Sequence, residues 1–112
     1  MNEEIEQLVR SHPGLVIVHL SEPFLEISQE MEEVIAETRQ WRADIRVVRV
    51  VLSLHREWAR NYRVFGSPCT LVFHNGELRA RAPGRFGQLR MREILERAGL
   101  LDSPPASLSA DP

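Results

Sequence analysis

The six-residue run from Leu15 to Leu20 constrains the fold of this chain more than any other segment. It reads Leu-Val-Ile-Val-His-Leu, so its side chains are almost all apolar and do not alternate between apolar and polar. A strand with this pattern is covered on both faces, as in a sheet that lies between two layers of helices.

The other segments alternate between helical and extended patterns. From their apolar spacing we expect helices over residues 2–11, 21–40, 53–62 and 87–98, and strands over 15–20, 45–52, 69–74 and 77–82. Asn75-Gly76 is a two-residue hairpin signal between the last two strands. The order α-β-α-β-α-β-β-α therefore predicts an α/β domain, with helix-linked parallel strands and an antiparallel hairpin at one edge.

Several local features of these elements can be predicted as well. Ser21 is expected to cap the second helix, with Glu22 and Pro23 in its first turn, and Ser53 is expected to cap the third. The inward faces are predicted to carry Leu54, Trp58 and Tyr62 in the third helix and Leu78, Ala80 and Ala82 in the last strand. Gly99 is a natural stop for the last helix, onto which Leu100 can fold back.

Charge is divided unevenly along the chain, although the net charge is only −2. Residues 1–37 hold nine glutamates and one arginine, whereas residues 38–101 hold thirteen arginines and five acidic residues. We expect acidic and basic elements to neutralise each other in the fold; the alternative is an interaction surface. Only 6% of the residues are aromatic, which disfavours a nucleic-acid partner that needs stacking side chains.

Length and composition limit the remaining classes. A chain of 112 residues fits one domain, which we assign to residues 1–101, with residues 102–112 as a disordered tail. No apolar run is long enough to cross a bilayer, and the acidic start lacks a signal core, so we expect a cytoplasmic protein with no membrane partner. The histidines at 12, 19, 55 and 74 lack metal-site spacing, and we predict neither metal nor cofactor.

Cys69 is the single cysteine of the sequence. One thiol excludes an intrachain disulfide, a thiolate metal cage and dithiol chemistry within the chain. It can be a buried small hydrophobic residue at the start of a strand, which we favour, or a reactive thiol. Packing roles are likewise favoured for His19, Trp41 and Trp58, and a capping role over a nucleophilic one for Ser21.

The stretch from Tyr62 to Glu77 resembles the thioredoxin family. Its Tyr-Arg-Val-Phe-Gly-Ser-Pro-Cys, five further strand residues and Asn-Gly-Glu follow the family pattern of Tyr, Gly-x-Pro-Thr, an apolar strand and Asn-Gly-Glu. The resemblance implies a thioredoxin-like fold over residues 3–101, with a mixed sheet of about four strands flanked by helices. It also implies that Pro68 is the cis-proline of that fold.

The chain departs from the family at two places. Where the family has its two-cysteine motif, this sequence has Ser21, Glu22, Pro23 and Phe24; the cysteine positions become Ser21 and Phe24, or Phe24 and Ile27, depending on register. Neither register holds a thiol, and exchange needs an attacking and a resolving thiol. The family's first strand is also expected to be missing, which would leave residues 45–52 as a sheet edge, either protected by Arg46 and Arg49 or used as a homodimer or partner seam.

These features lead to one leading functional hypothesis and two alternatives. By the resemblance, the Ser67-Pro68 loop would bind an extended peptide in a groove walled by Pro23, Phe24 and Phe65. Without cysteines we expect a redox-inactive protein that binds a protein partner, as a chaperone or assembly factor. The Val16–Pro23 segment is also loosely similar to bacterial hydrogenase-maturation chaperones of thioredoxin-like type. The alternatives are a monothiol oxidoreductase acting through Cys69 and an oligomer-forming accessory subunit that uses the edge strand.

Overall fold

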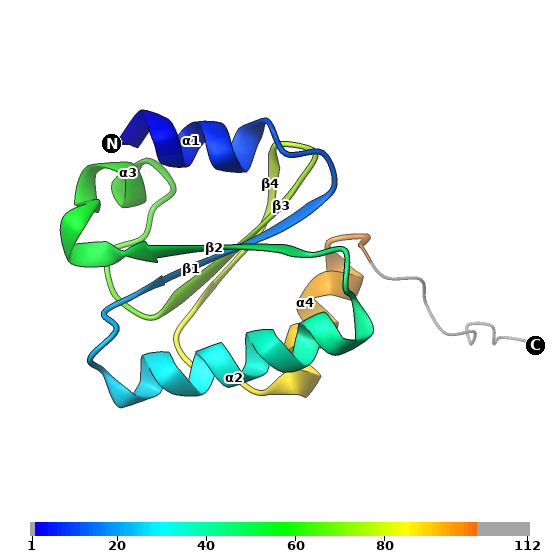
Figure 1. The fold of residues 1–112 in the computed structure, drawn as a ribbon. Helices are drawn as coiled ribbons and strands as arrows, with labels where there is room; N and C mark the ends of the chain where they lie inside the picture. Colours follow the sequence, from blue (N-terminus) through cyan, green and yellow to red (C-terminus); the bar gives the residue numbers. More distant parts are fainter. Residues whose placement is uncertain (1, 101–112) are drawn as a thin grey trace, which may run out of the picture.

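The computed structural model of the chain describes residues 2–100, which form one layered α/β unit (Figure 1). Predicted element types and order are confirmed, with a short 3-10 turn added before the third helix. In chain order the elements are α1 (Asn2–Arg10), β1 (Leu15–Ser21), α2 (Glu26–Trp41), β2 (Arg46–Val51), η1 (Leu52–Leu54), α3 (Arg56–Asn61), β3 (Cys69–His74), β4 (Glu77–Pro83) and α4 (Gln88–Arg97). The tail expected at residues 102–112 lies outside the described residues.

The sheet has the strand order β2-β1-β3-β4. β1 runs parallel to β2, to which α2 connects it, and antiparallel to β3. All seven residues of β1 are buried, which confirms that the apolar run is covered on both faces. Within the described sheet β2 is an edge strand, as expected, and its Arg46 and Arg49 are exposed.

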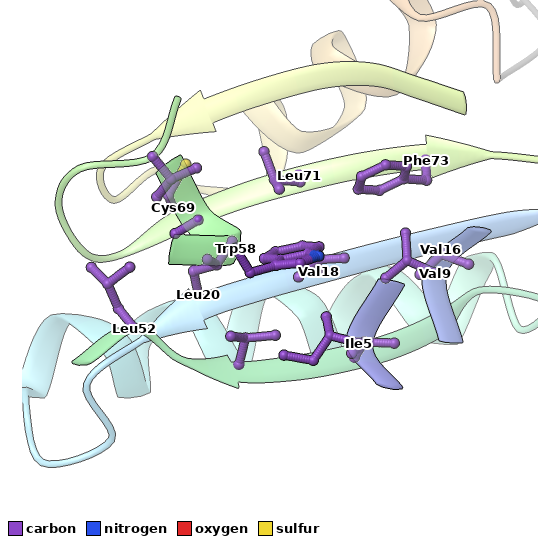
Figure 2. Close-up of a cluster of buried hydrophobic side chains, with 14 residues drawn as sticks. Ile5, Val9, Val16, Val18, Leu20, Leu52, Trp58, Cys69, Leu71 and Phe73 are labelled. Atoms are coloured by element: carbon purple, nitrogen blue, oxygen red, sulfur yellow. The ribbon is translucent and has the colours of Figure 1, made fainter. Parts of the chain in front are cut away.

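Two apolar clusters fill the space between the sheet and its helices. Figure 1 shows α1 and α3 on one side of the sheet and α2 and α4 on the other. The cluster beneath α1 and α3 is centred on Trp58, around which side chains of β1, β3 and α1 gather (Figure 2). The second cluster joins Ile35 of α2 and Met91 of α4 to the opposite face of the sheet. Alternate residues of β1 serve the two clusters, so this strand holds the layers together.

The predicted start of α2 is wrong. Ser21 does not cap the helix but ends β1, where it is buried and pairs with Val51 of β2. The strand continues because its backbone still finds partners in the parallel ladder, and a turn closed by Leu25 N–H on the Glu22 carbonyl follows. α2 then begins at Glu26, without a side-chain cap.

The inward face predicted for the third helix is correct only in part. The chain forms the 3-10 turn η1 before α3 starts at Arg56, so Ser53 does not cap α3 but donates a hydrogen bond from its hydroxyl to the Glu22 carboxylate, at 3.0 Å. The change of helix type turns Leu54 outward, with 66% of its surface exposed. Trp58 is buried and Tyr62 partly buried, as predicted.

A β-bulge corrects the prediction that Leu78, Ala80 and Ala82 share one side of β4. Ala80 pairs with Val72, but Leu78 pairs with Phe73, the next residue of β3, so the alternation shifts between them. Leu78 therefore lies on the opposite side of the strand from Ala80 and Ala82.

Ion pairs join the acidic first part of the chain to the arginine-rich second part, as expected. Glu30 of α2 pairs with Arg85 at 2.7 Å, and Glu32 pairs with Arg49 of β2 at 2.9 Å. Within the part of the chain that the structure describes, no helix is long and apolar enough to cross a membrane.

Glu6 and Glu32 make the stability of the fold depend on pH. Burial opposes ionisation of both, but hydrogen bonds from Tyr62, Trp58 and Arg10 to Glu6, and from Arg49 and His19 to Glu32, outweigh it and hold each pKa below its usual value of 4.5. A carboxyl whose pKa is lower in the folded state binds more protons when the chain is unfolded. Its contribution to the free energy of unfolding is therefore fully present above the pKa of the unfolded state and is lost as the pH falls through the pKa of the folded state. Urea unfolding should therefore give a lower free energy of unfolding at about pH 3 than at pH 7.

A substitution at Glu6 tests this pH dependence. Glu6→Gln should reduce the loss of stability between the two pH values, because glutamine has no proton to bind. Glu3→Gln, at an exposed position of the same helix, is the matched control. An equal loss in both variants and the wild type would show that Glu6 has no part in it.

Candidate functional site

Two loops come together at one end of the sheet. Leu20, near the end of β1, pairs with Cys69, the first residue of β3. The loop from β1 to α2 and the loop from α3 to β3 therefore emerge side by side, as Figure 1 shows. The residues of the predicted groove are all found in these two loops.

The α3–β3 loop begins with a turn that closes the C-terminus of α3. The Arg63 N–H bonds the Arg60 carbonyl at 2.9 Å and the Val64 N–H bonds the Ala59 carbonyl at 2.9 Å, which is the bond pair of a Schellman motif. Arg63 occupies its left-handed position with φ of 61°. This turn directs Val64 into the buried cluster and sends the following residues outward.

The next residues offer unpaired backbone groups. Among residues 2–100, the N–H and carbonyl groups of Phe65, Gly66 and Ser67 make no backbone hydrogen bond. The Ser67–Pro68 peptide bond is cis, as the resemblance implies, and the Pro68 carbonyl accepts a hydrogen bond from Gly84 N–H at 2.8 Å. The loop is thus anchored at Pro68, while the three residues before it can receive an added strand.

A surface hollow of about 400 Å³ lies beside this loop. Phe65, Ser67 and Pro68 line it, together with Arg63 and with Arg81 of β4. Phe65 is 72% exposed, so a large apolar side chain stands in water next to the unpaired backbone. The hollow combines an apolar wall, backbone donors and acceptors, and two arginine residues.

The structure divides the five residues of the predicted groove. Phe65, Ser67 and Pro68 line the hollow, but Pro23 lines a separate one of about 140 Å³ beside Ser28 and Arg49. Phe24 lines neither and is 79% exposed. The late start of α2 separates Pro23 and Phe24 from the hollow, because they belong to a loop before the helix and not to its first turn.

Cys69 is only 2% exposed and points into the cluster around Trp58 (Figure 2). Burial raises the pKa of its thiol, and the nearby Arg81 offsets this only in part. A thiol attacks as the thiolate, so its reactivity is lowered both by the raised pKa and by the small exposed fraction of the side chain. The geometry favours the packing role over the monothiol role.

His19 is a buried, hydrogen-bonded residue, as predicted. Its ring is fully buried and its Nδ1 lies 2.9 Å from Glu32, which in turn holds Arg49. The sequence reasoning missed this chain of contacts because it joins β1, α2 and β2, and only the strand register brings His19 opposite Arg49. Among the residues the structure describes, no group of three or more His, Cys, Asp or Glu side chains could hold a metal ion.

Sequence reasoning also missed Arg63 and Arg81 as site residues. Both are exposed, and nothing in their spacing in the sequence indicated that they would line one hollow. A usable signal was present at Arg63, since it comes directly before the Val-Phe-Gly-Ser-Pro loop. Arg81 is brought there by the pairing of β4 with β3, where it lies opposite Leu71.

Comparison with known proteins identifies the fold. No protein-family model and no curated protein matches the sequence. A mutant thioredoxin from Halobacterium salinarum superposes with a TM-score of 0.72 at 22% identity, covering 89% of this chain and 88% of that one. A chain from a study of thiol resolution in yeast mitochondrial 1-Cys peroxiredoxin gives 0.72 at 16% identity, covering 84% and 88%. The chain therefore has the thioredoxin-like fold that its sequence suggested.

Proposed function

We propose that this chain is a redox-inactive, cytoplasmic thioredoxin-like protein that binds a protein partner at the loop before Pro68, as a chaperone or assembly factor. The observation that carries the proposal is the unpaired backbone of Phe65, Gly66 and Ser67 beside an exposed aromatic ring. An extended segment of a partner can pair with this backbone as one added strand, and the phenyl ring gives it an apolar contact.

The cysteine content of the chain supports the absence of redox chemistry. The first turn of α2 and the loop before it contain no cysteine, and the single thiol of the sequence is buried. Thiol–disulfide exchange needs an accessible thiolate and a second thiol to resolve the mixed disulfide. A loop with unpaired backbone N–H and carbonyl groups but no accessible thiol would bind a polypeptide without reducing it.

The alternatives find less support. Burial of Cys69 weighs against a monothiol oxidoreductase. The edge strand β2 exposes Arg46 and Arg49, and charges on an edge hinder its pairing with another chain. We therefore assign partner binding to the loop and not to this edge.

A peptide selection tests the proposal. Random peptides displayed on phage are selected against the immobilised wild-type chain under reducing conditions, and the enriched peptides are measured by fluorescence anisotropy. We expect Ser67→Arg to weaken their binding about tenfold or more, since a bulky side chain blocks the added strand. Ser11→Arg, near the start of β1 at the other end of the sheet, is the matched control and should bind as the wild type does.

Two results would contradict the proposal. One is unchanged binding by Ser67→Arg. The other comes from a second selection without reductant: a peptide that stays bound until reductant is added, and that Cys69→Ser does not retain, would establish the monothiol alternative. Circular dichroism spectra of the variants confirm that each is folded.

A further inference from the structure

We infer that the partner segment bound at this loop carries a carboxylate side chain beside an apolar one, and that Arg63 and Arg81 recognise the carboxylate. This inference rests on the proposed function and names the chemistry of the partner. Three observations support it: the position of the two arginines at the hollow, the absence of ion pairs to them among the described residues, and the left-handed backbone conformation of Arg63.

The fold brings the two arginines to one hollow from different elements. Arg63 closes the end of α3, on the face of the sheet that α1 and α3 cover. Arg81 lies opposite Leu71, whose side chain belongs to the cluster on that same face. Both line the hollow together with Ser67 and Pro68, so a segment paired with the loop would pass beside two arginine residues.

Neither arginine is neutralised by another of the described residues. Within residues 2–100, no carboxylate forms an ion pair with Arg63 or Arg81, and neither guanidinium donates a hydrogen bond. Other arginines of the chain are held: Arg10 by Glu6, Arg49 by Glu32 and Arg85 by Glu30. Arg46 and Arg97 are also exposed and form no ion pair among the described residues, but Arg63 and Arg81 differ from them in lining the hollow beside the unpaired backbone. A carboxylate would complement these two arginines with charge-assisted hydrogen bonds.

The backbone of Arg63 gives an independent argument. α4 ends in the same turn as α3, with Gly99 N–H on the Glu96 carbonyl and Leu100 N–H on the Leu95 carbonyl. There the left-handed position, with φ of 77°, is filled by glycine, the usual residue, whereas α3 places an arginine at φ of 61°. A non-glycine residue in this conformation is disfavoured. The arginine side chain at this position is thus not explained by the needs of the turn.

The hollow fits a peptide better than a nucleic acid. The unpaired N–H and carbonyl groups of Gly66 and Ser67 match the alternating groups of an extended polypeptide. A single-stranded nucleic acid would need several aromatic side chains in series for base stacking, and Phe65 is the one aromatic residue among the described residues that line the hollow. We therefore assign the two arginines to an acidic peptide segment.

The peptides selected on the wild-type chain are the probe for this inference. We expect Asp and Glu to be enriched next to an apolar residue, and replacement of the acid by its amide to weaken binding. Arg63→Gly and Arg81→Gln should each weaken binding of the acidic peptide about three- to tenfold. Arg63→Gly removes the charge while keeping a residue suited to the turn, so the variant should fold. Arg97→Gln, an exposed arginine of α4 that does not line the hollow, is the matched control and should bind normally.

The outcomes separate this inference from the proposed function. If Ser67→Arg abolishes binding while Arg63→Gly and Arg81→Gln bind as tightly as the wild type, the acidic preference is wrong and the proposed function stands. If Ser67→Arg has no effect, the proposed function fails and the inference with it. A random single-stranded oligonucleotide that displaces the selected peptides at lower concentration than an acidic peptide does would overturn the assignment to an acidic peptide segment.

Discussion

Replacing Trp58 by alanine is expected to lower the free energy of unfolding by about 3–5 kcal/mol, the usual range for a buried aromatic side chain. Trp58 is 2% exposed and lies at the centre of the cluster beneath α1 and α3 (Figure 2). Its ring centroid lies 4.7 Å from that of Tyr62, and its Nε1 donates to Glu6 at 2.7 Å. Alanine would leave a cavity and also remove one of the hydrogen bonds that hold Glu6.

The second tryptophan supplies the control. Trp41 is half-buried at the end of α2, where its Nε1 donates to Gln88 at 2.9 Å and Arg92 covers its ring. Trp41→Ala should cost no more than about 2 kcal/mol, because less surface is removed from the core. Each variant keeps one tryptophan, so urea unfolding can be followed by fluorescence in both. Equal losses in the two variants would contradict the placement of Trp58 at the centre of the core.

Gly76→Ala is expected to be the other strongly destabilising change. Asn75 and Gly76 form the hairpin turn with φ of 52° and 84°, both in the left-handed region. A β-carbon at Gly76 would lie 2.5 Å from the carbonyl oxygen of Arg10, at the end of α1. The conformation costs about 1–2 kcal/mol, and the clash with a backbone atom adds about 1–3 kcal/mol.

Gly84 separates these two contributions. Its φ is 85°, but a β-carbon there would meet no atom within 4 Å. Gly84→Ala should therefore show the conformational cost alone, and the difference between the two variants in urea unfolding measures the contact of the turn with α1. Equal destabilisation would mean that the turn does not touch the end of α1 closely.

Strand and helix types were predictable because they depend on patterns within single segments. The apolar run of β1, the Asn75-Gly76 turn and the Gly99 stop each carry their own local signal, and the structure confirms all three. The edge position of β2 and the cis bond before Pro68 followed from the resemblance to the thioredoxin family and are also confirmed.

The errors arose where pairing with a distant segment overrides a local preference. Ser21 has the composition of a helix cap, but the ladder with β2 keeps it in the strand. The bulge before Ala80 depends on the register with β3, and no feature of residues 77–82 alone indicates it. The two arginines of the hollow were missed for the same reason, since residues 63 and 81 meet only after β4 has paired.

Glu6 joins the first helix to the helix that precedes the proposed binding loop. Its carboxylate accepts hydrogen bonds from Trp58 and Tyr62, which lie in α3 and at its end, one residue before Arg63. Fluctuations that move α1 away from the sheet would thus break its contacts with α3 and make the α3–β3 loop more mobile at the same time. The N-terminal helix, far from Ser67 in sequence, would then determine the lifetime of the loop conformation that we propose binds a partner. The residence time of that partner and the exchange of α3 amides with solvent should therefore be governed by one opening motion.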